Sequence, residues 1–599
     1  MPDVSLKSVL DVGTSLNKAR WVMPDVPLDV LEQAVRRSGA SEIAARLLLG
    51  RGIALEDFDA FLTPWLKDHF PDPFSLKGMA DMAHDVALWI KEGRSFAIFG
   101  DFDVDGATSS AVLYRFLKAC GIEVRVYIPD RLSEGYGPNE AAFQTLRDEG
   151  AEVLFVLDCG ITSFDVIAKG RAMGMDIIVM DHHEAEDRLP EANHVINPKR
   201  RGDESGLDVL AAVGVTFLSC VGINKLLREQ GFWEGRTAPD LRHFLDIVAL
   251  GTVCDMVPLL GPNRLFVRHG MARLNRLENA GIAALCDVSR LDGEISVSHL
   301  GFALGPRINA GGRIHQSDLG AKLLCTDDPQ EAEQIAWQLN DCNDKRKAIQ
   351  LEMQRGAEAQ VEDGGLDQHE VILVDDTDWH PGLSGLVAGK LKDKYGKPAC
   401  VVTYTKTGEG GLEGRGSGRS ISGVHLAQSF IDARNAGLLL KGGGHAMAGG
   451  FTIDPVHLDA FKAFMMDHVR AQQSGGSVAI ETQVDALISP LGASVALLKE
   501  LEQQVGPFGQ DFQAPLFVMS HVRLHEVDIV GEQHIRLMVS DWEGGSRIKA
   551  MAFGAVGTAM GEAFLTQGKQ PFHLCGQLSL NRWQGRESAE LHVKDAVVA

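Results

Sequence analysis

Short aliphatic runs and stretches of helical periodicity alternate between residues 76 and 285. Apolar runs of four to five residues are typical of strands in a parallel sheet, which are buried on both faces. The segments between them repeat apolar residues every three to four positions, as helices that cover a sheet do. This βαβ order predicts an α/β domain with a parallel sheet and helices on both faces. The expected strands are 95–99, 124–128, 153–157 and 177–180, and the expected helices are 107–119 and 139–148.

The rest of the chain shows different patterns. The N-terminal region is helix-prone, and the region after the first sheet ends in a polar helical stretch that predicts a long helix joining two lobes. A second, glycine-rich α/β lobe follows. Near the C-terminus apolar and polar residues alternate between turn signals, which predicts a small β-barrel. The expected regions are 1–75 (helical), 76–285 (first α/β lobe), 286–365 (helical connector), 366–475 (second α/β lobe) and 476–599 (barrel).

Composition narrows the class of protein. The chain has 599 residues, of which 45% are hydrophobic and 23% charged, as in ordinary globular proteins. No apolar stretch reaches the ~18 residues that span a bilayer, and residues 1–10 lack an export-signal pattern. We therefore expect a cytoplasmic protein without membrane association. The nine cysteines form no C-x-x-C pair, which argues against a zinc ribbon or a disulfide framework. A net charge of −23 argues against a passive nucleic-acid coat, but bound cations could offset carboxylates in an enzyme.

Acidic residues and histidines follow the expected strands. Asp101, Asp103 and Asp105 come after the first strand, Asp158 after the third, and Asp181-His182-His183 after the fourth. Because the carboxyl ends of parallel strands share one edge of a sheet, these side chains are expected to converge. A fourth acidic position, Asp255, lies in the segment 253–259 (VCDMVPL).

This set of side chains predicts a site for two divalent cations. Hard carboxylate oxygens suit Mg²⁺ or Mn²⁺, and an imidazole shifts the preference toward Mn²⁺. Two such ions clamp the attacking and leaving oxygens of a phosphoryl displacement. The residues therefore predict a metal-dependent phosphoester hydrolase.

The motifs carrying these residues resemble those of the DHH phosphoesterase superfamily. They are GDFDVDG (100–106), DCG (158–160), DHH (181–183) and VCDMVPL. Later segments narrow the resemblance to the single-strand-specific exonucleases of that superfamily, namely GPRINAGGR (305–313), WHPGLSGLVAGKL (379–391), GSGRS (416–420) and GGGHAMAGG (442–450). The resemblance runs from about residue 70 to the C-terminus. It implies a catalytic DHH domain, a DHHA1-type substrate-binding domain and an OB-type barrel.

The resemblance also implies roles for the clustered residues. Asp103 and Asp105 would bind separate ions bridged by Asp158. His182 and Asp255 would complete the second site, and Asp101 would support or join the first. Asp181 would orient a histidine, and His183 would face the scissile phosphate. The histidine that many superfamily members carry four residues before the first metal aspartate is replaced here by Phe99.

Glycine-rich segments and arginines are expected to hold the substrate. Glycines let backbone N–H groups approach a phosphate, and no nucleotide P-loop motif is present. With nearby arginines they predict a clamp for a strand end, and the resemblance implies that some of these residues hold the 5′ end. The expected substrate-binding residues are Arg131, Arg307, Asn309, Arg313, His380, Ser417, Arg419 and His445. For His380 and His445 a structural role is an equal alternative.

OB-type barrels bind single strands by stacking bases on aromatic side chains beside basic ones. Trp542, Phe553 and Trp583, with Lys549, Arg582 and Arg586, are candidates for this role. Each aromatic could equally belong to the barrel core.

Three functions remain for comparison. The first is a 5′→3′ exonuclease on single-stranded DNA that releases 5′-mononucleotides in DNA repair and recombination; polarity and substrate come from the resemblance. The second is a hydrolase of short oligonucleotides, cyclic dinucleotides or pyrophosphate, against which the added barrel argues. The third is a catalytically inactive nucleic-acid-binding scaffold, against which the retained acids argue. The resemblance implies single-stranded DNA with a 5′ end as substrate, and a single-strand-binding protein and a helicase as partners. The layout is compatible with a monomer.

Overall fold

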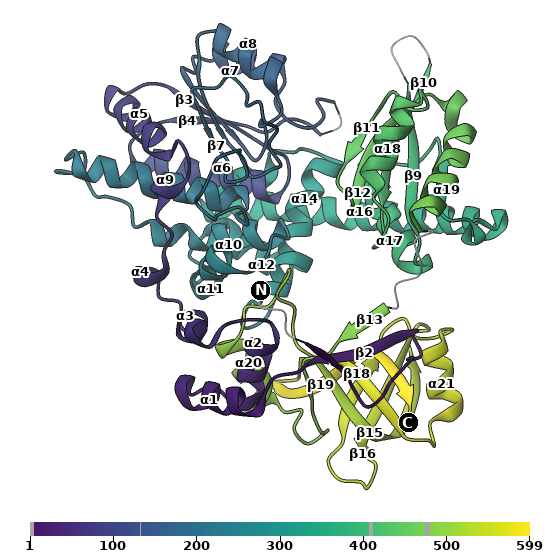
Figure 1. The fold of residues 1–599 in the computed structure, drawn as a ribbon. Helices are drawn as coiled ribbons and strands as arrows, with labels where there is room; N and C mark the ends of the chain where they lie inside the picture. Colours follow the sequence, from purple (N-terminus) through teal and green to yellow (C-terminus); the bar gives the residue numbers. More distant parts are fainter. Residues whose placement is uncertain (1–4, 132, 407–410, 474–479) are drawn as a thin grey trace. The chain divides into compact units, whose positions relative to one another are not determined.

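The computed structural model describes residues 5–131, 133–406, 411–473 and 480–599 (Figure 1). The chain divides into two compact units. One consists of Asp72–Asp255 and His269–Ser477, and the other of Met1–Pro71, Met256–Arg268 and Val478–Ala599. The first unit carries both α/β lobes and the second carries the barrel. Two α/β lobes joined by a long helix, together with an OB-type barrel, confirm the fold class expected from the sequence.

A parallel sheet forms the centre of the first lobe. Its strand order is β4-β3-β5-β6-β7, and every neighbouring pair is parallel. Strands β3 and β5 are buried along their whole length, because helices cover both faces of the sheet. The strands are β3 (Phe96–Gly100), β4 (Val124–Tyr127), β5 (Val153–Leu157), β6 (Asp176–Met180) and β7 (His194–Ile196).

Helices α7 and α8 pack on one face of this sheet, and α5, α6 and α9 contact the other. Helix α6 is almost wholly buried, since α9, α10 and α15 pack around it. The helices of this lobe and the connector are α5 (Met79–Glu92), α6 (Val104–Ala119), α7 (Glu140–Asp148), α8 (Phe164–Ala172), α9 (Ala212–Glu229), α10 (Leu245–Cys254), α11 (Gly261–Leu274), α12 (Ala280–Val288), α13 (Val297–His299), α14 (Gly305–Ile314) and α15 (Leu319–Cys325).

The expected long helix is α16 (Pro329–Gly364), which spans 36 residues. It begins where the Asp328 side chain accepts a hydrogen bond from the Gln330 N–H and where Pro329 fixes the first helical position. It ends at Gly365, whose φ of +61° closes the last turn in a conformation that glycine adopts without strain. The sequence therefore carries clear signals for both ends of this helix, although most of its surface is polar.

The second lobe is a mixed sheet of order β11-β12-β10-β9-β8. Strands β8 and β9 are parallel, whereas β9, β10, β12 and β11 pair antiparallel. Helices α17 and α16 share one apolar core with this sheet, and α18 and α19 share another. The elements are β8 (Ile372–Asp376), α17 (Ser384–Tyr395), β9 (Ala399–Lys406), β10 (Leu412–Arg419), α18 (Leu426–Asn435), β11 (Lys441–Gly444), β12 (Ala448–Ile453) and α19 (Leu458–Gln473).

The other unit is built around a closed barrel. Strands β15, β16, β17, β19 and β18 follow one another, and β15 also pairs with β18, which closes the ring. Ring closure leaves these strands without the exposed edges of an open sheet. The elements are β13 (Ile480–Gln483), β14 (Ala486–Leu487), α20 (Val495–Gln504), β15 (Leu516–Val530), β16 (His534–Asp541), β17 (Ile548–Ala552), α21 (Ala559–Gln567), β18 (Phe572–Trp583) and β19 (Arg586–Val598).

The N-terminal region differs from the purely helical expectation. It begins with β1 (Leu6–Ser8) and β2 (Ala19–Pro24), and β2 lies between β1 and β13 in a small sheet. Helices α1 (Leu28–Ser38) and α2 (Glu42–Gly50) share the barrel's hydrophobic core, and α3 (Phe58–Leu62) and α4 (Leu66–His69) follow. Strand β2 pairs with the three-residue β1 on one side and with β13, over 450 positions away, on the other, and the second pairing leaves no local pattern in the sequence.

Residues 256–268 also belong to the barrel unit, although the sequence pattern places them in the first lobe. The buried Arg264 donates to the carbonyl oxygen of Gly506 at 2.8 Å, and its guanidinium lies 3.8 Å from the centre of the Phe61 ring. Leu259 N–H donates to the Gln510 carbonyl oxygen at 2.9 Å. No helix within the described parts of the chain is both long and apolar enough to cross a membrane.

The N-terminal segment is expected to stabilise the barrel unit through Trp21. This side chain is fully buried, and its Nε1–H donates to Asp595 Oδ2 at 2.8 Å. We predict that Trp21→Ala lowers the free energy of unfolding of this unit by about 3–5 kcal/mol, because it leaves a large cavity and an unpaired carboxylate oxygen. Urea denaturation followed by circular dichroism measures the effect. Trp65→Ala removes an indole that is 58% exposed and should change the value by less than about 0.5 kcal/mol. Equal losses in the two variants would contradict the prediction.

Candidate metal centre and substrate site

The carboxyl ends of β3, β5 and β6 bring the clustered acids and histidines together, as the parallel sheet requires. Asp101 follows β3, Asp158 follows β5, and Asp181 to His183 follow β6. Asp255 arrives from the end of α10. Within each of three groups the potential ligand atoms lie within 4.8 Å of one another: Asp101, Asp103 and Asp158; Asp105, His182 and Asp255; and Asp158, His182 and His183. Asp158 and His182 each belong to two groups, so the groups form one continuous centre.

Local backbone geometry holds these acids close together. Asp103 is the N-cap of α6, and its Oδ1 accepts hydrogen bonds from the N–H groups of Asp105 (2.9 Å) and Gly106 (3.1 Å). A Cβ atom at Gly106 would lie 2.3 Å from the Asp101 carbonyl oxygen, so the turn requires glycine. Asp158 has a φ of +59°, a left-handed conformation that a non-glycine residue rarely adopts. Such strain is characteristic of functional sites.

His182 lies at the centre of the second group. Its Nε2 is 3.4 Å from Asp158 Oδ1, 3.5 Å from Asp255 Oδ2 and 3.8 Å from Asp105 Oδ2. Asp105 is fixed by the N–H groups of Ala212 (2.7 Å) and Val213 (2.9 Å), which both donate to its carboxylate.

Asp181 positions the histidines. Its Oδ1 accepts the His182 and His183 backbone N–H groups and lies 2.7 Å from His183 Nδ1, while Oδ2 accepts the N–H of Ile161. Burial raises the pKa of Asp181, but the hydrogen bond and charge of His183 outweigh it and hold the pKa below its usual value. Burial likewise lowers the pKa of His183, but the bond to Asp181 raises it overall. His183 is therefore oriented and favoured in its protonated form.

The clustered acids have strongly perturbed pKa values. Burial, together with the neighbouring Asp103, raises the pKa of Asp105 to about 7. Burial and the charge of Asp105 raise the pKa of Asp255 to about 9. The pKa values of Asp101 and Asp158 also rise for the same two reasons, burial and nearby carboxylates. Four acids that resist ionisation together indicate a site built around added positive charge.

The residues fit divalent cations by a second criterion. The buried atoms Asp101 Oδ1, Asp158 Oδ1 and Asp255 Oδ2, and both ring nitrogens of His182, lack a hydrogen-bond partner among the described residues. Buried polar atoms normally have a hydrogen-bond partner, so a group of them without one needs another explanation. Bound metal ions would supply the missing partner. Burial lowers the pKa of His182 to about 4, so the ring is neutral, as a ligand must be.

Neighbouring side chains that could compete as ligands are otherwise engaged. The thiols of Cys159 and Cys254 donate to the carbonyl oxygens of Leu157 (3.3 Å) and Leu300 (3.4 Å), and burial raises both pKa values. Phe99, at the position of the superfamily histidine, is fully buried and stacks on Tyr127 at 5.7 Å. It contributes to the sheet core and offers no ligand.

Arginines from both lobes gather near this centre. Arg131 lies with its guanidinium 4.6 Å from the centre of the Phe102 ring, within reach of the charges of Asp101 and Asp103. Arg313 of α14 donates to the Gly382 carbonyl oxygen at 2.8 Å. Burial, then the charges of Arg131, Arg346 and Arg419, lower the pKa of Arg313 to about 9. Mutually repelling arginines indicate a site for an anion such as phosphate.

Arg346 is a member of this group that the sequence did not single out. It lies on α16 and bonds to Asn343 and Gln350 of the same helix. Within a long polar helix it resembles any solvated arginine, so only the tertiary packing shows that it belongs with the other three.

Ser417 and Arg419 stand on β10 next to the start of α17. Ser384, the first residue of that helix, donates to Ser417 Oγ at 3.0 Å. A Cβ atom at Gly385 would lie 2.9 Å from Arg419 Nη2, so the guanidinium rests directly on the first turn of the helix. The N-terminus of a helix favours anions, and here a serine and an arginine flank it. Ser384 is a further candidate that the sequence analysis did not name.

The remaining expected substrate residues are more scattered. Arg307 turns to α16, where its Nε donates to Asn340 Oδ1 at 3.0 Å, while its Nη1 donates to the Ala303 carbonyl oxygen. The segment 305–313 is helical rather than a loop. Asn309 and Arg313, four residues apart, therefore share a face of the helix, whereas Arg307 points about 200° around the helix from Asn309. His380 accepts the Gly382 N–H through Nδ1 and thereby caps a turn. His445 is exposed in the turn between β11 and β12.

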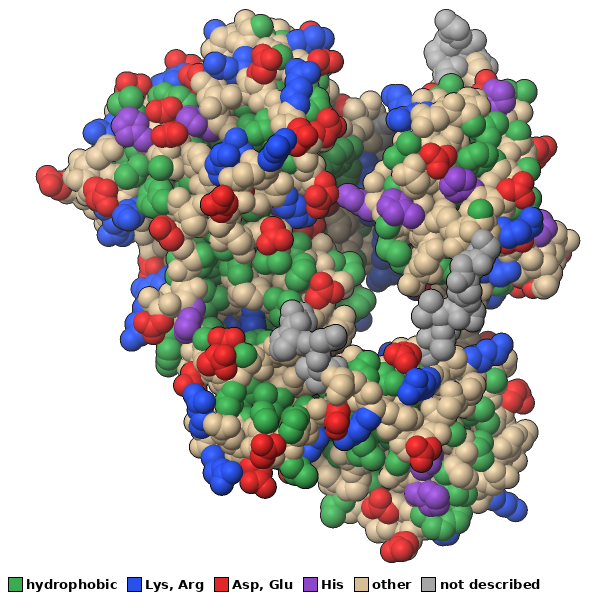
Figure 2. All heavy atoms as spheres, in the orientation of Figure 1, with side chains coloured by type: hydrophobic (Ala, Val, Ile, Leu, Met, Phe, Trp, Pro, Cys, Tyr) green, Lys and Arg blue, Asp and Glu red, His purple; other side chains and the backbone are tan. Residues whose placement is uncertain are grey.

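Most of the barrel residues expected to bind single strands have contacts within the barrel itself. The guanidinium of Arg523 lies 4.6 Å from the Trp542 ring, and the 54% exposed Phe553 contacts the rings of His534 and His592. Lys549 pairs with Glu590, and Arg582 with Glu587, while Arg586 is exposed. The side chain of Trp583 lies outside the described residues. On the face shown in Figure 2, basic and acidic side chains are interspersed.

Comparisons with known proteins agree with this architecture. The chain matches the family descriptions "DHH family, N-terminal domain" over residues 95–252, "DHHA1 domain" over 368–471 and "RecJ OB domain" over 484–595. The Thermus thermophilus structure of RecJ in complex with Mn²⁺ superimposes with a TM-score of 0.76 at 25% identity, covering 96% of this chain and 78% of that one.

Two relatives extend the match along nearly the whole chain. The single-stranded-DNA-specific exonuclease RecJ of Escherichia coli is 34% identical over 91% of this chain and 94% of its own length. The protein of the same name in Bacillus subtilis is 31% identical over 97% of this chain and 71% of its own length. Because relatives at least 30% identical match most of its length, and the DHH, DHHA1 and RecJ OB descriptions match it in that order, this protein belongs to the RecJ family.

Proposed function

We propose that this protein is an exonuclease specific for single-stranded DNA that digests from the 5′ end, releases 5′-mononucleotides and acts in DNA repair and recombination. The observation that carries the proposal is the buried cluster of acids and histidines beside an anion site of arginines. The RecJ relatives are named as single-stranded-DNA-specific exonucleases and cover nearly the whole chain, which supports the substrate.

We assign the cluster to two Mn²⁺ or Mg²⁺ ions. Asp101, Asp103 and Asp158 would hold one ion, and Asp105, His182 and Asp255 the other, with Asp158 between them. When bound, such ions activate a water for attack and offset the charge of the phosphate. The chain's own part is to hold six ligands at fixed positions, which removes the cost of arranging them during the reaction.

His183 is the group we assign to the reacting phosphate. Its Nδ1 is occupied by Asp181, which leaves Nε2 for the substrate, and its side chain is 38% exposed. Because the bond to Asp181 raises the pKa of His183, the protonated ring, which can donate a hydrogen bond to a phosphate oxygen, is favoured.

The arginine site and the start of α17 would hold the phosphates of the strand end. Arg131, Arg313 and Arg419 would supply charge, and Ser417 and the N–H groups of the first turn of α17 would supply hydrogen bonds. Asn309, on the face of α14 that carries Arg313, is assigned to the same strand. His380 and His445 lie in two turns of the second lobe, and we assign them to the following nucleotides.

The remaining proposals concern the cellular setting. We place the protein in the cytoplasm, where chromosomal DNA is processed in bacteria, and expect it to act as a monomer. A helicase would supply the single strand, and a single-strand-binding protein would present it.

Metal binding should depend on pH in a defined direction. In the ion-free fold the pKa values of Asp105 (about 7) and Asp255 (about 9) lie above those of an unfolded chain, near 4. Their contribution to stability is therefore present at low pH and is lost as pH rises from about 4 to 9. Mn²⁺ opposes this loss because it favours the ionised carboxylates. We predict that Mn²⁺ raises the thermal unfolding temperature more at pH 8 than at pH 6, as measured by calorimetry.

Asp158→Asn should abolish this Mn²⁺ shift. Asp246→Asn is the matched control, because Asp246 is also a buried aspartate with a pKa raised by burial, to about 6, but stands outside the cluster. A Mn²⁺ shift that is the same at both pH values would argue against these ligands.

Digestion assays test the activity itself. We predict that the protein with Mn²⁺ degrades a 5′-tailed strand, stops at a 5′ block but not at a 3′ block, and leaves blunt duplex intact. Asp158→Ala should lower turnover by about 10³-fold or more while retaining strand binding, because loss of a shared ligand removes several kcal/mol of transition-state stabilisation. Gel electrophoresis of labelled strands measures both. Asp246→Asn should digest normally, and equal digestion by Asp158→Ala would sink the metal assignment.

Arginine contacts with phosphate should appear in the salt dependence of binding. Arg313→Ala and Arg419→Ala should each weaken binding to a single strand and lower the slope of log K against log salt by about 0.7. Fluorescence anisotropy in a salt series measures the slope. Arg242→Ala removes an exposed arginine that already pairs with Asp240 and should leave it unchanged. An unaltered slope in both site variants would show that these arginines contact no phosphate.

A further inference from the structure

Strand β8 is the outer strand of the second lobe's sheet and pairs with β9 on one side only. Ile372 N–H donates to the Pro398 carbonyl oxygen at 2.9 Å, toward β9. Because backbone groups alternate in direction along a strand, Leu373 and Asp375 point their N–H and C=O groups away from β9. The free edge of the sheet therefore presents backbone donors and acceptors for a further strand.

The side chain of Gln360 already occupies part of this edge. Its Oε1 accepts the Asp375 N–H at 3.3 Å, and its Nε2 donates to the Asp375 carbonyl oxygen at 2.9 Å. A carboxamide that bonds both groups of one residue imitates the peptide unit of a neighbouring strand. It pairs Asp375, whereas Leu373, two residues earlier, is 5% exposed and lines the adjacent groove.

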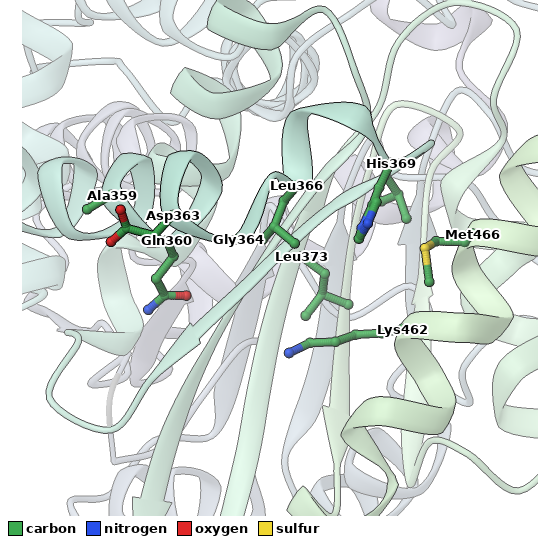
Figure 3. A pocket seen from close by; sticks show the side chains of 10 residues that line it. Ala359, Gln360, Asp363, Gly364, Leu366, His369, Leu373, Lys462 and Met466 are labelled. Atoms are coloured by element: carbon green, nitrogen blue, oxygen red, sulfur yellow. The ribbon is translucent and has the colours of Figure 1, made fainter.

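A groove of about 560 Å³ runs along this open part of β8 (Figure 3). Ala359, Asp363 and Leu366 line it from the end of α16 and the turn that follows, and Lys462 and Met466 line it from α19. Figure 3 shows the side chains of the two helices on opposite sides of the strand that carries Leu373. The groove thus lies between residues of two helices, with β8 at its base.

The core on each side keeps this edge rigid. Leu373 packs with the α19 core, and the adjacent Ile372 and Val374 pack with the α16 core. A rigid edge with apolar walls is the arrangement by which proteins bind extended peptides, since main-chain bonds give affinity and the walls select alternate side chains. Natural sheets usually cover or block such an edge.

The charges of the groove favour a basic partner. Lys462 pairs with Asp375 at 3.1 Å, so its charge is offset. Asp363, on the α16 wall, has no ion-pair partner among the described residues, whereas the adjacent Glu362 pairs with Lys394. The groove is also lined by His369, and Asp363 is the single carboxylate in the described part of its lining. This carboxylate disfavours the phosphates of nucleic acid, and a second copy of β8 would bring another Asp363 against it.

We propose that the groove along β8 binds an extended segment of a partner protein, which adds a strand to the sheet beside Leu373. The segment has β-branched or aliphatic residues at alternate positions facing Met466, and a lysine or arginine facing Asp363. The surface is separate from the metal centre, so the partner does not compete for the proposed ligands or arginines.

Selection of a displayed library of random eight-residue peptides against the full-length chain tests this. We expect enriched peptides that alternate apolar and polar residues and carry a basic residue. A synthetic copy of such a peptide should bind in fluorescence anisotropy, and Ala359→Trp, which fills the groove, should weaken binding at least tenfold. Ala348→Trp adds the same side chain at an exposed position of α16 outside the groove and should leave binding unchanged.

A second measurement uses the unaltered protein. N-methylation of the peptide at the residues that face the edge removes their N–H donors and should weaken binding at least tenfold, while bound peptide should slow hydrogen exchange in residues 371–375. The proposal is overturned if no peptide is enriched, if N-methylation is without effect, or if the chain pairs with itself through this edge in sedimentation. Because nuclease activity is not the readout, these outcomes are independent of the proposed exonuclease.

Discussion

Like-charge repulsion among buried carboxylates is the constraint on which the site depends. Asp101, Asp105, Asp158 and Asp255 are all buried or nearly so, and burial and a neighbouring carboxylate raise the pKa of each. The parallel sheet delivers them to one edge, and the capped α6 and the strained Asp158 hold them there. The fold maintains an arrangement that is unfavourable in isolation, and a divalent cation makes it favourable. Positive charge beside it, on arginines of both lobes, then places a phosphate next to the metal centre.

Much of the first lobe could be predicted because its information is local. The apolar runs of β3, β5 and β6 are buried on both faces, and each is followed at once by its acid. The rule that parallel strands share one carboxyl edge then brought Asp101, Asp158 and His182 together without further knowledge. The long helix α16 was equally accessible, because its start and stop signals lie in the sequence.

Other features depended on contacts that leave no local trace. Arg307 and Arg313 appear equivalent in a glycine-rich motif, but the helical turn of α14 sends them to different sides. Arg346 and Ser384 join the anion site only through tertiary packing. The small sheet around β2 could not be recognised, because one of the two partners of β2, β13, lies near the other end of the chain.

The bond between Trp21 and Asp595 also has a consequence for biosynthesis. The two residues are 574 positions apart, so at 5–20 residues per second the indole waits about half a minute to two minutes for its acceptor to be translated. During that interval both α/β lobes can leave the ribosome and fold, whereas the first seventy residues still lack the barrel against which they pack. The part of the protein that is made first is therefore among the last to reach its native contacts, and its exposed apolar surface is a natural target for chaperones during synthesis.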